Sequence, residues 1–325
     1  SASDKAKDLI RMAVARAMLL EPLTQISYKV KRSALVIGGG LSGMAAALSL
    51  AEQGIPVHLV EKEKELGGTA RRIHYTLERN DIQDHVQSLF RQVYKNLLVQ
   101  VHTESRLLDF SGYVGNFRSR IALGDRGVVK DIEHGVTIVA TGTEEFKPAV
   151  YLYGQDPRVV TQLELEQEIH AGGELMKQCG TMVMIQCVGS RDEERPYCSR
   201  ICCSQAVKNA LKLKNLNPGM DIYVLYRDMR TYAFKEDYYR QAAEKGVVFI
   251  RYEKEDQPDV TIAEEEGRSV LRVTVTEPTL GGRFMINADR VALAAAVLPA
   301  ADNRPLSRLL KVPLNEDGFF MEAHM

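Results

Sequence analysis

The feature that most constrains the fold is a glycine-rich turn between a short apolar strand and a helical segment. Residues 33–37 form a β-branched run, Gly38-x-Gly40-x-x-Gly43 follows directly, and a helical pattern continues to residue 53. Strand, turn and helix in this order predict a dinucleotide-binding unit. Gly38 permits the tight turn, Gly40 lets the backbone approach a pyrophosphate, and Gly43 allows close packing of the helix. The helix N-terminus, with Leu41 and Ser42, offers free N–H groups to the phosphates.

A second strand strengthens this prediction. Residues 57–60 read as a β-strand that ends at Glu61, about twenty residues beyond the glycine motif. A carboxylate at this point can accept hydrogen bonds from a ribose hydroxyl. The context therefore predicts a Rossmann-type domain that binds a dinucleotide through Gly38, Gly40, Gly43 and Glu61.

Two further segments favour a flavin over a nicotinamide. The stretch from Glu61 to Arg71 resembles the glutamate-to-Gly-Gly segment of flavoproteins with two dinucleotide-binding domains, such as thioredoxin reductase. Residues 136–142 resemble the strand and Ala-Thr-Gly turn through which such proteins leave their flavin domain. The resemblance implies FAD, bound additionally by Lys62, Gly67, Gly68, Thr69, Arg71, Thr141 and Gly142.

The remaining pattern predicts an α/β fold with one nucleotide-type domain inserted in another. Short alternating strands over 106–134 and 259–286 predict two meanders, and residues 290–295 read as the strand that returns to the first domain. We expect an N-terminal helical segment at 1–32, an FAD domain at 33–150 plus 288–325, truncated at its C-terminal end, and an inserted NAD-domain-like unit at 151–287. The first helix, about 4–20, is expected to pack on its own domain. The chain is expected to be a piece of a longer protein.

Composition excludes several functional classes. With 325 residues and 45% apolar side chains, the chain is long enough for two cores. A net charge of −1 provides no broad basic face, so a nucleic-acid partner is not expected. No apolar run approaches the roughly 20 residues of a membrane span, and the N-terminus lacks a signal-peptide pattern. The protein is expected to be cytoplasmic.

Four of the five cysteines cluster within seventeen residues, at the place where the inserted domain would carry its own glycine motif. They are Cys187, Cys198, Cys202 and Cys203. The glycines of a second pyrophosphate site are missing, so the NAD(P) site is predicted to be lost. Nearby positive side chains are expected to favour thiolate or a net-negative cluster; they are Arg191, Arg195, Arg200 and Lys208.

Spacing alone leaves three uses of these thiols open. A structural zinc site usually has two separated C-x-x-C pairs, which the adjacent Cys202 and Cys203 do not match. A redox disulfide between Cys198 and Cys202, at i and i+4, could form across a helical turn but leaves two thiols unexplained. An iron–sulfur cluster tolerates irregular spacing.

A resemblance distinguishes between these uses. The run from Met184 to Cys203 resembles the A subunit of heterodisulfide reductase, an iron–sulfur flavoprotein of methanogens with relatives in sulfate reducers and sulfur oxidisers. Segments at 151–154, 161–166, 226–232 and 312–320 match as well. The resemblance implies a 4Fe-4S cluster on Cys187, Cys198, Cys202 and Cys203, FAD on the 38–43 turn and Glu61, and a catalytic Lys208 near flavin N5.

The family resemblance also implies an activity and partners. The chain is expected to be the electron-transfer core of a multi-subunit complex. It would pass or bifurcate electrons between a donor, ferredoxin and a disulfide-type acceptor, alongside hydrogenase or ferredoxin-like carriers and with a homodimer as a possible assembly. It lacks the cysteine-rich ferredoxin-like motifs of long family members. Bifurcation by this chain alone is therefore not expected.

Two alternatives of other classes stay open. One is an NAD(P)H-dependent disulfide oxidoreductase with a Cys198/Cys202 redox pair, and the other is a non-catalytic scaffold. The fifth cysteine, Cys179, lies outside the pattern and is predicted to be a small buried apolar side chain.

Overall fold

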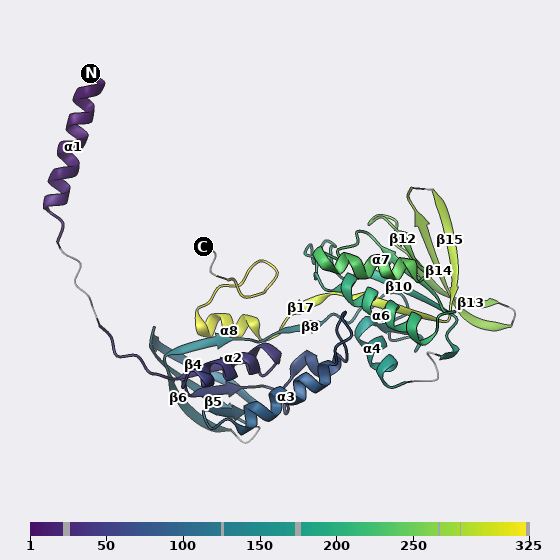
Figure 1. Ribbon diagram of the computed structural model, residues 1–325, viewed down its shortest axis with the longest axis horizontal. Coiled ribbons are helices and arrows are strands. Elements are labelled where there is room, and N and C mark those ends of the chain that lie inside the picture. The colour runs from purple at the N-terminus through teal and green to yellow at the C-terminus, as the bar shows by residue number, and fades with distance from the viewer. Residues whose placement is uncertain (22–26, 125–126, 173–176, 266, 280, 323–325) are drawn as a thin grey trace.

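Two α/β domains lie side by side in the computed structural model, which describes residues 1–21, 27–124, 127–172, 177–265, 267–279 and 281–322 (Figure 1). The domains are joined by a ribbon of two antiparallel strands, β8 (Thr143–Glu145) and β17 (Val297–Pro299). A helix at the N-terminus, α1 (Ala2–Met18), projects away from both domains.

The first domain is built on a four-stranded parallel sheet in the order β3-β2-β1-β7. Two helices cover one face, and a three-stranded antiparallel meander with a C-terminal helix covers the other. The sheet strands are β1 (Ala34–Ile37), β2 (Val57–Val60), β3 (Val99–His102) and β7 (Val136–Val139). The covering elements are α2 (Leu41–Glu52), α3 (Ile82–Lys95), β4 (Ser105–Tyr113), β5 (Asn116–Leu123), β6 (Val128–His134) and α8 (Asn303–Leu310).

Burial on both faces explains the continuous apolar sequence of β1. Successive side chains of a strand point to opposite faces. Ala34 and Val36 pack with the helices, whereas Leu35 and Ile37 pack with the meander and α8. A parallel strand covered on both faces needs apolar residues at every position, and all four are buried.

The second domain repeats this plan. Its parallel sheet has the order β12-β11-β10-β16-β9, with helices on one face and an antiparallel meander on the other. The sheet strands are β9 (Val159–Thr161), β10 (Thr181–Val188), β11 (Asp221–Tyr226), β12 (Val247–Arg251) and β16 (Arg290–Ala295). The covering elements are α4 (Gln162–His170), α6 (Cys202–Leu216), α7 (Glu236–Glu244), β13 (Asp259–Glu265), β14 (Arg268–Glu277) and β15 (Gly282–Ala288).

These elements confirm the predicted pair of α/β units and both meanders, but one strand was assigned to the wrong domain. Arg290–Ala295, expected to return to the first domain, pairs with β10 and β9 inside the second sheet. Its side chains are buried against that sheet's two core clusters. The chain returns to the first domain only with β17, which lies directly after it.

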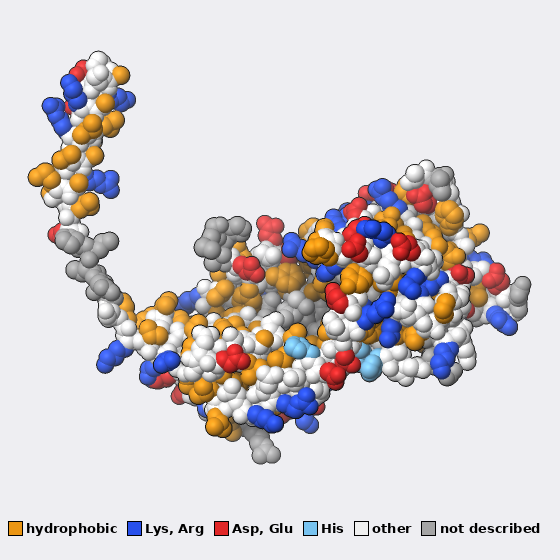
Figure 2. All heavy atoms as spheres, viewed as in Figure 1, with side chains coloured by type: hydrophobic (Ala, Val, Ile, Leu, Met, Phe, Trp, Pro, Cys, Tyr) orange, Lys and Arg blue, Asp and Glu red, His pale blue; other side chains and the backbone are white. Residues whose placement is uncertain are grey.

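The packing expected for the first helix is also wrong. None of the residues of α1 is buried, and Figure 2 shows hydrophobic side chains in the open along it. The helix is held by its own local bonds: the Ser1 hydroxyl accepts from the Asp4 N–H, and the Asp4 carboxylate accepts from Ser1. Helical spacing predicts the helix, but it does not say what the apolar face packs against.

No helix in the described part of the chain is both long and apolar enough to cross a bilayer.

Candidate functional site

The glycine turn has the close contacts that the motif predicts. Gly38 has φ of +106°, and a Cβ there would lie 2.2 Å from the Ala140 carbonyl oxygen. A Cβ on Gly43 would lie 1.8 Å from the Gly38 carbonyl oxygen, so only glycine lets α2 approach β1 this closely. A Cβ on Gly40 would meet nothing within 4 Å. Gly40 therefore leaves open space at the start of α2, where N–H groups can reach a ligand.

Glu61 is fixed at the carboxyl end of β2. Its side chain is buried and accepts backbone N–H bonds from Gly39, at 2.6 Å, and from Glu63, at 2.8 Å. These bonds hold the carboxylate against the glycine turn. Because each carboxylate oxygen can accept a second bond, Glu61 retains capacity for a ribose hydroxyl.

Three neighbouring cavities run from Glu61 toward the second domain. A cavity of about 410 Å³ shares Gly38, Glu61, Lys62 and Thr141 with a second of about 770 Å³. The second shares Thr69, Ile73, Thr143 and Glu144 with a third of about 510 Å³, which is bounded on its far side by α6. Together they form an elongated channel with the glycine turn at its centre.

The predicted cofactor-binding residues gather around the middle cavity. All of them line it except Gly43, which faces β1 from within α2, and Arg71, whose guanidinium pairs with Glu65 at 2.9 Å. Those that line it are Gly38, Gly40, Leu41, Ser42, Glu61, Lys62, Gly67, Gly68, Thr69, Thr141 and Gly142.

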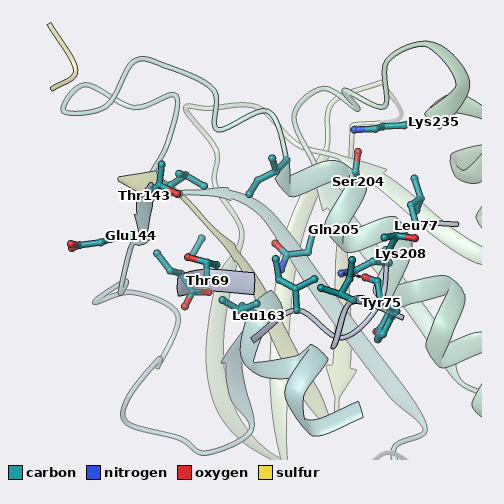
Figure 3. A pocket seen from close by; sticks show the side chains of 18 of the residues that line it. Thr69, Tyr75, Leu77, Thr143, Glu144, Leu163, Ser204, Gln205, Lys208 and Lys235 are labelled. Atoms are coloured by element: carbon teal, nitrogen blue, oxygen red, sulfur yellow. Dashed lines mark hydrogen bonds between the residues drawn. The ribbon is translucent and has the colours of Figure 1, made fainter. Parts of the chain in front are cut away.

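One face of α6 forms the wall of the third cavity (Figure 3). The lining residues are spaced by three and four along the helix, as expected for neighbours on one face, and they are Ile201, Ser204, Gln205 and Lys208. The loop after η1 (Gly68–Arg72) faces them from the first domain with Tyr75 and Leu77. The cavity is therefore bounded by both domains.

Lys208 lies in this wall, as expected, but its ammonium is already engaged. Nζ donates to the Glu166 carboxylate at 2.7 Å and to the Tyr75 carbonyl oxygen at 3.0 Å. Burial lowers the pKa of Lys208, and this effect outweighs the nearby Glu166 charge, which raises it. The sequence pattern correctly predicted that Lys208 lies on a helix. It did not predict that the buried Glu166 carboxylate holds the Lys208 ammonium.

The four clustered cysteines lie where β10 ends and α6 begins. Cys187, the residue before the last of β10, has a left-handed conformation with φ of +61° and lies where the register with β16 shifts. Cys202 and Cys203 are the first two residues of α6. Cys198 lies in the connecting loop, and Arg200 between it and the helix has φ of +64°. Cys198 and Cys202 are therefore not on one helical turn, contrary to the pairing across a turn that their i, i+4 spacing suggested.

Burial opposes the expected thiolate form of three of these cysteines. It is the largest cause of a raised pKa at Cys187 and Cys203, and it raises the pKa of Cys202 to about 12. Arg191 and Arg227 lower the pKa of Cys187, but by less than burial raises it. The expectation that the positive side chains would dominate is wrong for these thiols, because removal of a charge from water costs more than those cations return.

The site suits a soft metal group in its chemistry, although it is not preassembled. All cysteines are free thiols, and no three metal-type ligands within the described ranges are grouped closely enough to hold an ion. The thiols nevertheless affect one another: Cys198 raises the pKa of Cys187, Cys202 and Cys203. Metal coordination would supply the free energy to deprotonate them. Cys179 is buried elsewhere, in the core beneath α6, as predicted.

The cysteine loop is attached to the ribbon between the domains. Tyr197 OH donates to the Val297 carbonyl oxygen, and the Val297 N–H donates to Ser199 Oγ, both at 2.9 Å. Phe146 directly follows the other ribbon strand, β8, and it lies close to Gly189. A Cβ on Gly189 would lie 2.3 Å from the Phe146 ring. The loop that carries Cys198 thus contacts the connection between the two domains.

Several site residues escaped the sequence analysis. Glu166 accepts from the His74 N–H and the Lys208 ammonium and is fully buried. Glu166 lies three residues from both Leu163 and Ile169, which are buried in α4. This helical spacing could have predicted that Glu166 is buried as well. Arg106 and Asp302, at the cavity beside Glu61, come from remote segments and carry no local motif.

Comparison with known proteins agrees with this geometry. Residues 34–131 match the family model described as FAD dependent oxidoreductase. The chain is 31% identical to the iron-sulfur A subunit of CoB–CoM heterodisulfide reductase from Methanocaldococcus jannaschii over 99% of its own length. It is 30% identical, over the same share, to the A subunit of H2:CoB–CoM heterodisulfide,ferredoxin reductase from Methanothermobacter marburgensis. The chain is a homologue of heterodisulfide reductase A subunits.

This homologue spans 62% of the length of each of these two relatives. The alignment with the Methanocaldococcus protein extends over 414 positions, more than the 325 residues of the chain. That relative therefore has additional residues within the matched region as well as outside it.

Solved structures confirm the fold of this A-subunit homologue. Thioredoxin reductase of Lactococcus lactis matches 90% of the chain and 85% of its own length with a TM-score of 0.57 at 15% identity. Thioredoxin reductase of T. acidophilum matches 89% of the chain and 83% of its own length with a TM-score of 0.56 at 15% identity. The two-domain architecture expected from the sequence is thus confirmed. The family model and the named relatives support an oxidoreductase.

Proposed function

We propose that this chain is the electron-transfer core of a heterodisulfide reductase-type A subunit, with FAD and one 4Fe-4S cluster. In a multi-subunit complex it would pass or divide electrons between a donor, ferredoxin and a disulfide-type acceptor. One observation carries the proposal: α6 begins with Cys202 and Cys203 and presents Lys208 to the end of the dinucleotide channel. A single helix therefore connects the two proposed redox centres.

The channel supports FAD in particular. The adenosine half would lie at Glu61 and the pyrophosphate at the open space beside Gly40, with Lys62 at the boundary of the first two cavities. A further cavity of about 510 Å³ beyond the pyrophosphate position has room for a flavin ring. When bound, FAD would accept and release electrons, and the residues around it would orient it and exclude water.

The cysteine site supports a cluster. Cys187, Cys198, Cys202 and Cys203 supply four sulfur ligands, the number that a 4Fe-4S cluster requires. The second domain has no Gly-x-Gly-x-x-Gly motif here: β10 ends at Val188, and Gly189 is followed by Ser190 and Arg191. The cluster would relay single electrons along α6 when bound. The chain's contribution is burial and a set of N–H donors around the sulfurs.

Lys208 would serve the flavin from the wall of the third cavity. Its ammonium is the positive group at this point of α6, and Glu166 holds it in place. We propose that Lys208 hydrogen-bonds flavin N5, with Glu166 as its positioning residue. Replacement by Met should lower the flavin reduction potential, whereas Lys212→Met, at the exposed position one turn later, should leave it unchanged.

Anaerobic preparation followed by iron, sulfide and flavin quantitation with EPR tests the proposal. We expect about four iron and four sulfide per chain and about one FAD. Cys198→Ser should remove the EPR signal and most of the iron, while Cys179→Ala, the matched control outside the site, should retain both. Loss of iron in both variants or in neither would contradict the ligand assignment.

Two further outcomes would favour other functions. Rapid bleaching of bound flavin by NADH or NADPH in stopped-flow mixing would favour a disulfide oxidoreductase with a Cys198/Cys202 pair. A reconstituted chain that holds neither iron nor flavin but binds partner proteins would favour a scaffold.

A further inference from the structure

Gln186 is a buried amide without a partner. Its side chain is 1% exposed, and neither Nε2 nor Oε1 has a hydrogen-bond partner among the residues that the structure describes. Burial of an unpaired amide carries a desolvation penalty, and such groups are uncommon in native structures. The amide therefore indicates a ligand that is polar and lies beside the end of β10.

The strand's alternation places this amide under the start of α6. Met182 and Met184 belong to the core cluster that includes Ala206 of α6, whereas Val183 and Ile185 face the meander on the other side. Alternation after Ile185 predicts that Gln186 falls on the face of the two methionines, at the start of the stretch up to Val188 where the register with β16 shifts. In a strand–loop–helix unit the strand's carboxyl end lies beside the helix N-terminus. Gln186 thus faces the first turn of α6.

The first turn of α6 favours a negatively charged group. The N-cap residue is Ile201, which provides no side-chain cap, and the helix is 15 residues long. Uncapped N–H groups and the helix dipole both attract anions. Ser204 in the same turn has a buried hydroxyl that is also unpartnered.

A further donor comes from the opposite side. The Arg191 guanidinium lies 3.9 Å from Cys187 Sγ and is held by Asp228, which also lies 3.7 Å from Arg230. Arginine has only donors. The α6 N-terminus and Arg191 therefore both present hydrogen-bond donors at the cysteines, and the buried amide of Gln186 belongs to the residue directly before Cys187.

We propose that Gln186 is a positioning residue whose amide N–H donates to a sulfur of the anionic group held by the four cysteines. This inference rests on the proposed function. Hydrogen bonds to the sulfurs stabilise the more negative, reduced state of a cluster and so raise its reduction potential. Gln186 would thus set how readily the cluster takes an electron from a flavin at the other face of α6.

The decisive experiment compares Gln186→Met with the wild-type chain and with Met184→Leu, a buried control on the same face of β10. EPR-monitored redox titration of anaerobically reconstituted protein gives the potential. We expect Gln186→Met to lower the equilibrium constant for cluster reduction about tenfold, which is about 59 mV for one electron. Met184→Leu should leave the potential unchanged, and Gln186→Glu, which adds negative charge, should lower it as well. A wild-type potential in Gln186→Met would overturn the inference.

Thermal unfolding of the metal-free chain provides a second readout that does not need the cluster. An amide that serves only the ligand is unpaired without it, so Gln186→Met should unfold at the wild-type temperature or above it. A lower unfolding temperature would show that the amide serves the fold and would overturn the inference. A wild-type chain that takes up neither iron nor sulfide would instead contradict the proposed function, which the quantitation reveals separately.

Discussion

Lys208 of α6 and Glu166 of α4 form a buried ion pair, 2.7 Å from Nζ to Oε2, that holds the backbone of the other domain. Glu166 is fully buried and Lys208 is 11% exposed. Lys208 donates to the Tyr75 carbonyl oxygen, and Glu166 accepts from the His74 N–H at 2.7 Å. Asn209 extends the contact, since its side chain accepts from Tyr75 OH at 2.9 Å. One pair of side chains therefore helps to join the two domains and occupies the wall of the third cavity.

Loss of the Glu166 charge should destabilise the chain strongly. Glu166→Gln leaves the Lys208 ammonium buried without a counter-charge, and we expect the free energy of unfolding in urea to fall by about 3 kcal/mol. Lys147→Gln is the matched control, because Lys147 pairs with Glu145 and Glu164 but is half exposed. It should cost less than about 1 kcal/mol. Equal losses in the two variants would contradict a structural role for the buried pair.

Substitution of Gly40 should weaken FAD binding, whereas substitution of Gly43 should lower the stability of the chain. Gly40→Ala places its Cβ in open space, so the flavin-free chain should keep its unfolding temperature while FAD binds at least about tenfold more weakly. Gly43→Ala drives a Cβ into the Gly38 carbonyl and should cost about 1–3 kcal/mol of stability before any FAD is added. Calorimetry and flavin fluorescence titration measure the two effects. Unchanged FAD affinity in Gly40→Ala would place the pyrophosphate elsewhere.

His102 should make the first domain sensitive to acid. Burial, then Lys130 and His58, lower the pKa of His102 to about 4, so the folded chain keeps it neutral at a pH where the unfolded chain protonates it. Its contribution to stability is complete above pH 6.5 and is lost as the pH falls toward 4. His102→Gln should reduce the stability loss between pH 7 and pH 4.5 by about 1–2 kcal/mol, allowing for partial solvent screening.

The control for this pH profile is His85→Gln, since His85 is exposed on α3. Its urea-unfolding profile against pH should match that of the wild-type chain. A His102→Gln profile that also matches would show that the pKa of His102 does not differ between the folded and the unfolded chain.

Removal of residues 1–20 should leave the two domains as stable as before. No side chain of α1 is buried, so the deletion removes no core contacts, and the free energy of unfolding should change by less than about 0.5 kcal/mol. Urea unfolding of the shortened chain measures this. A larger loss would mean that α1 packs on the domains in solution.

The site was only partly predictable from the sequence. Some of its residues belong to short sequence motifs, whereas others are brought to the site only by packing of distant segments. The glycine turn, Glu61 and the cysteine run are local patterns with fixed spacing, so each was located at the correct element. A Cys198/Cys202 pair across a helical turn was compatible with the spacing, because spacing cannot reveal that Arg200 takes a left-handed conformation and that α6 begins only at Cys202. Of the side chains expected to favour thiolate, Arg191 does lower the pKa of Cys187, but the burial that outweighs this effect depends on packing.

The two α/β units, the glycine turn and the clustering of thiols at β10 and α6 could be predicted from local patterns, because strand periodicity, glycine sterics and short sequence spacing act locally. Packing of distant segments was needed to show that β16 completes the second sheet, that Glu166 pairs with Lys208, and that the buried Gln186 amide has no partner among the described residues. Those relationships depend on which surfaces exclude water together. Water is excluded where segments far apart in the chain pack against each other, and a local sequence pattern cannot predict which segments do so.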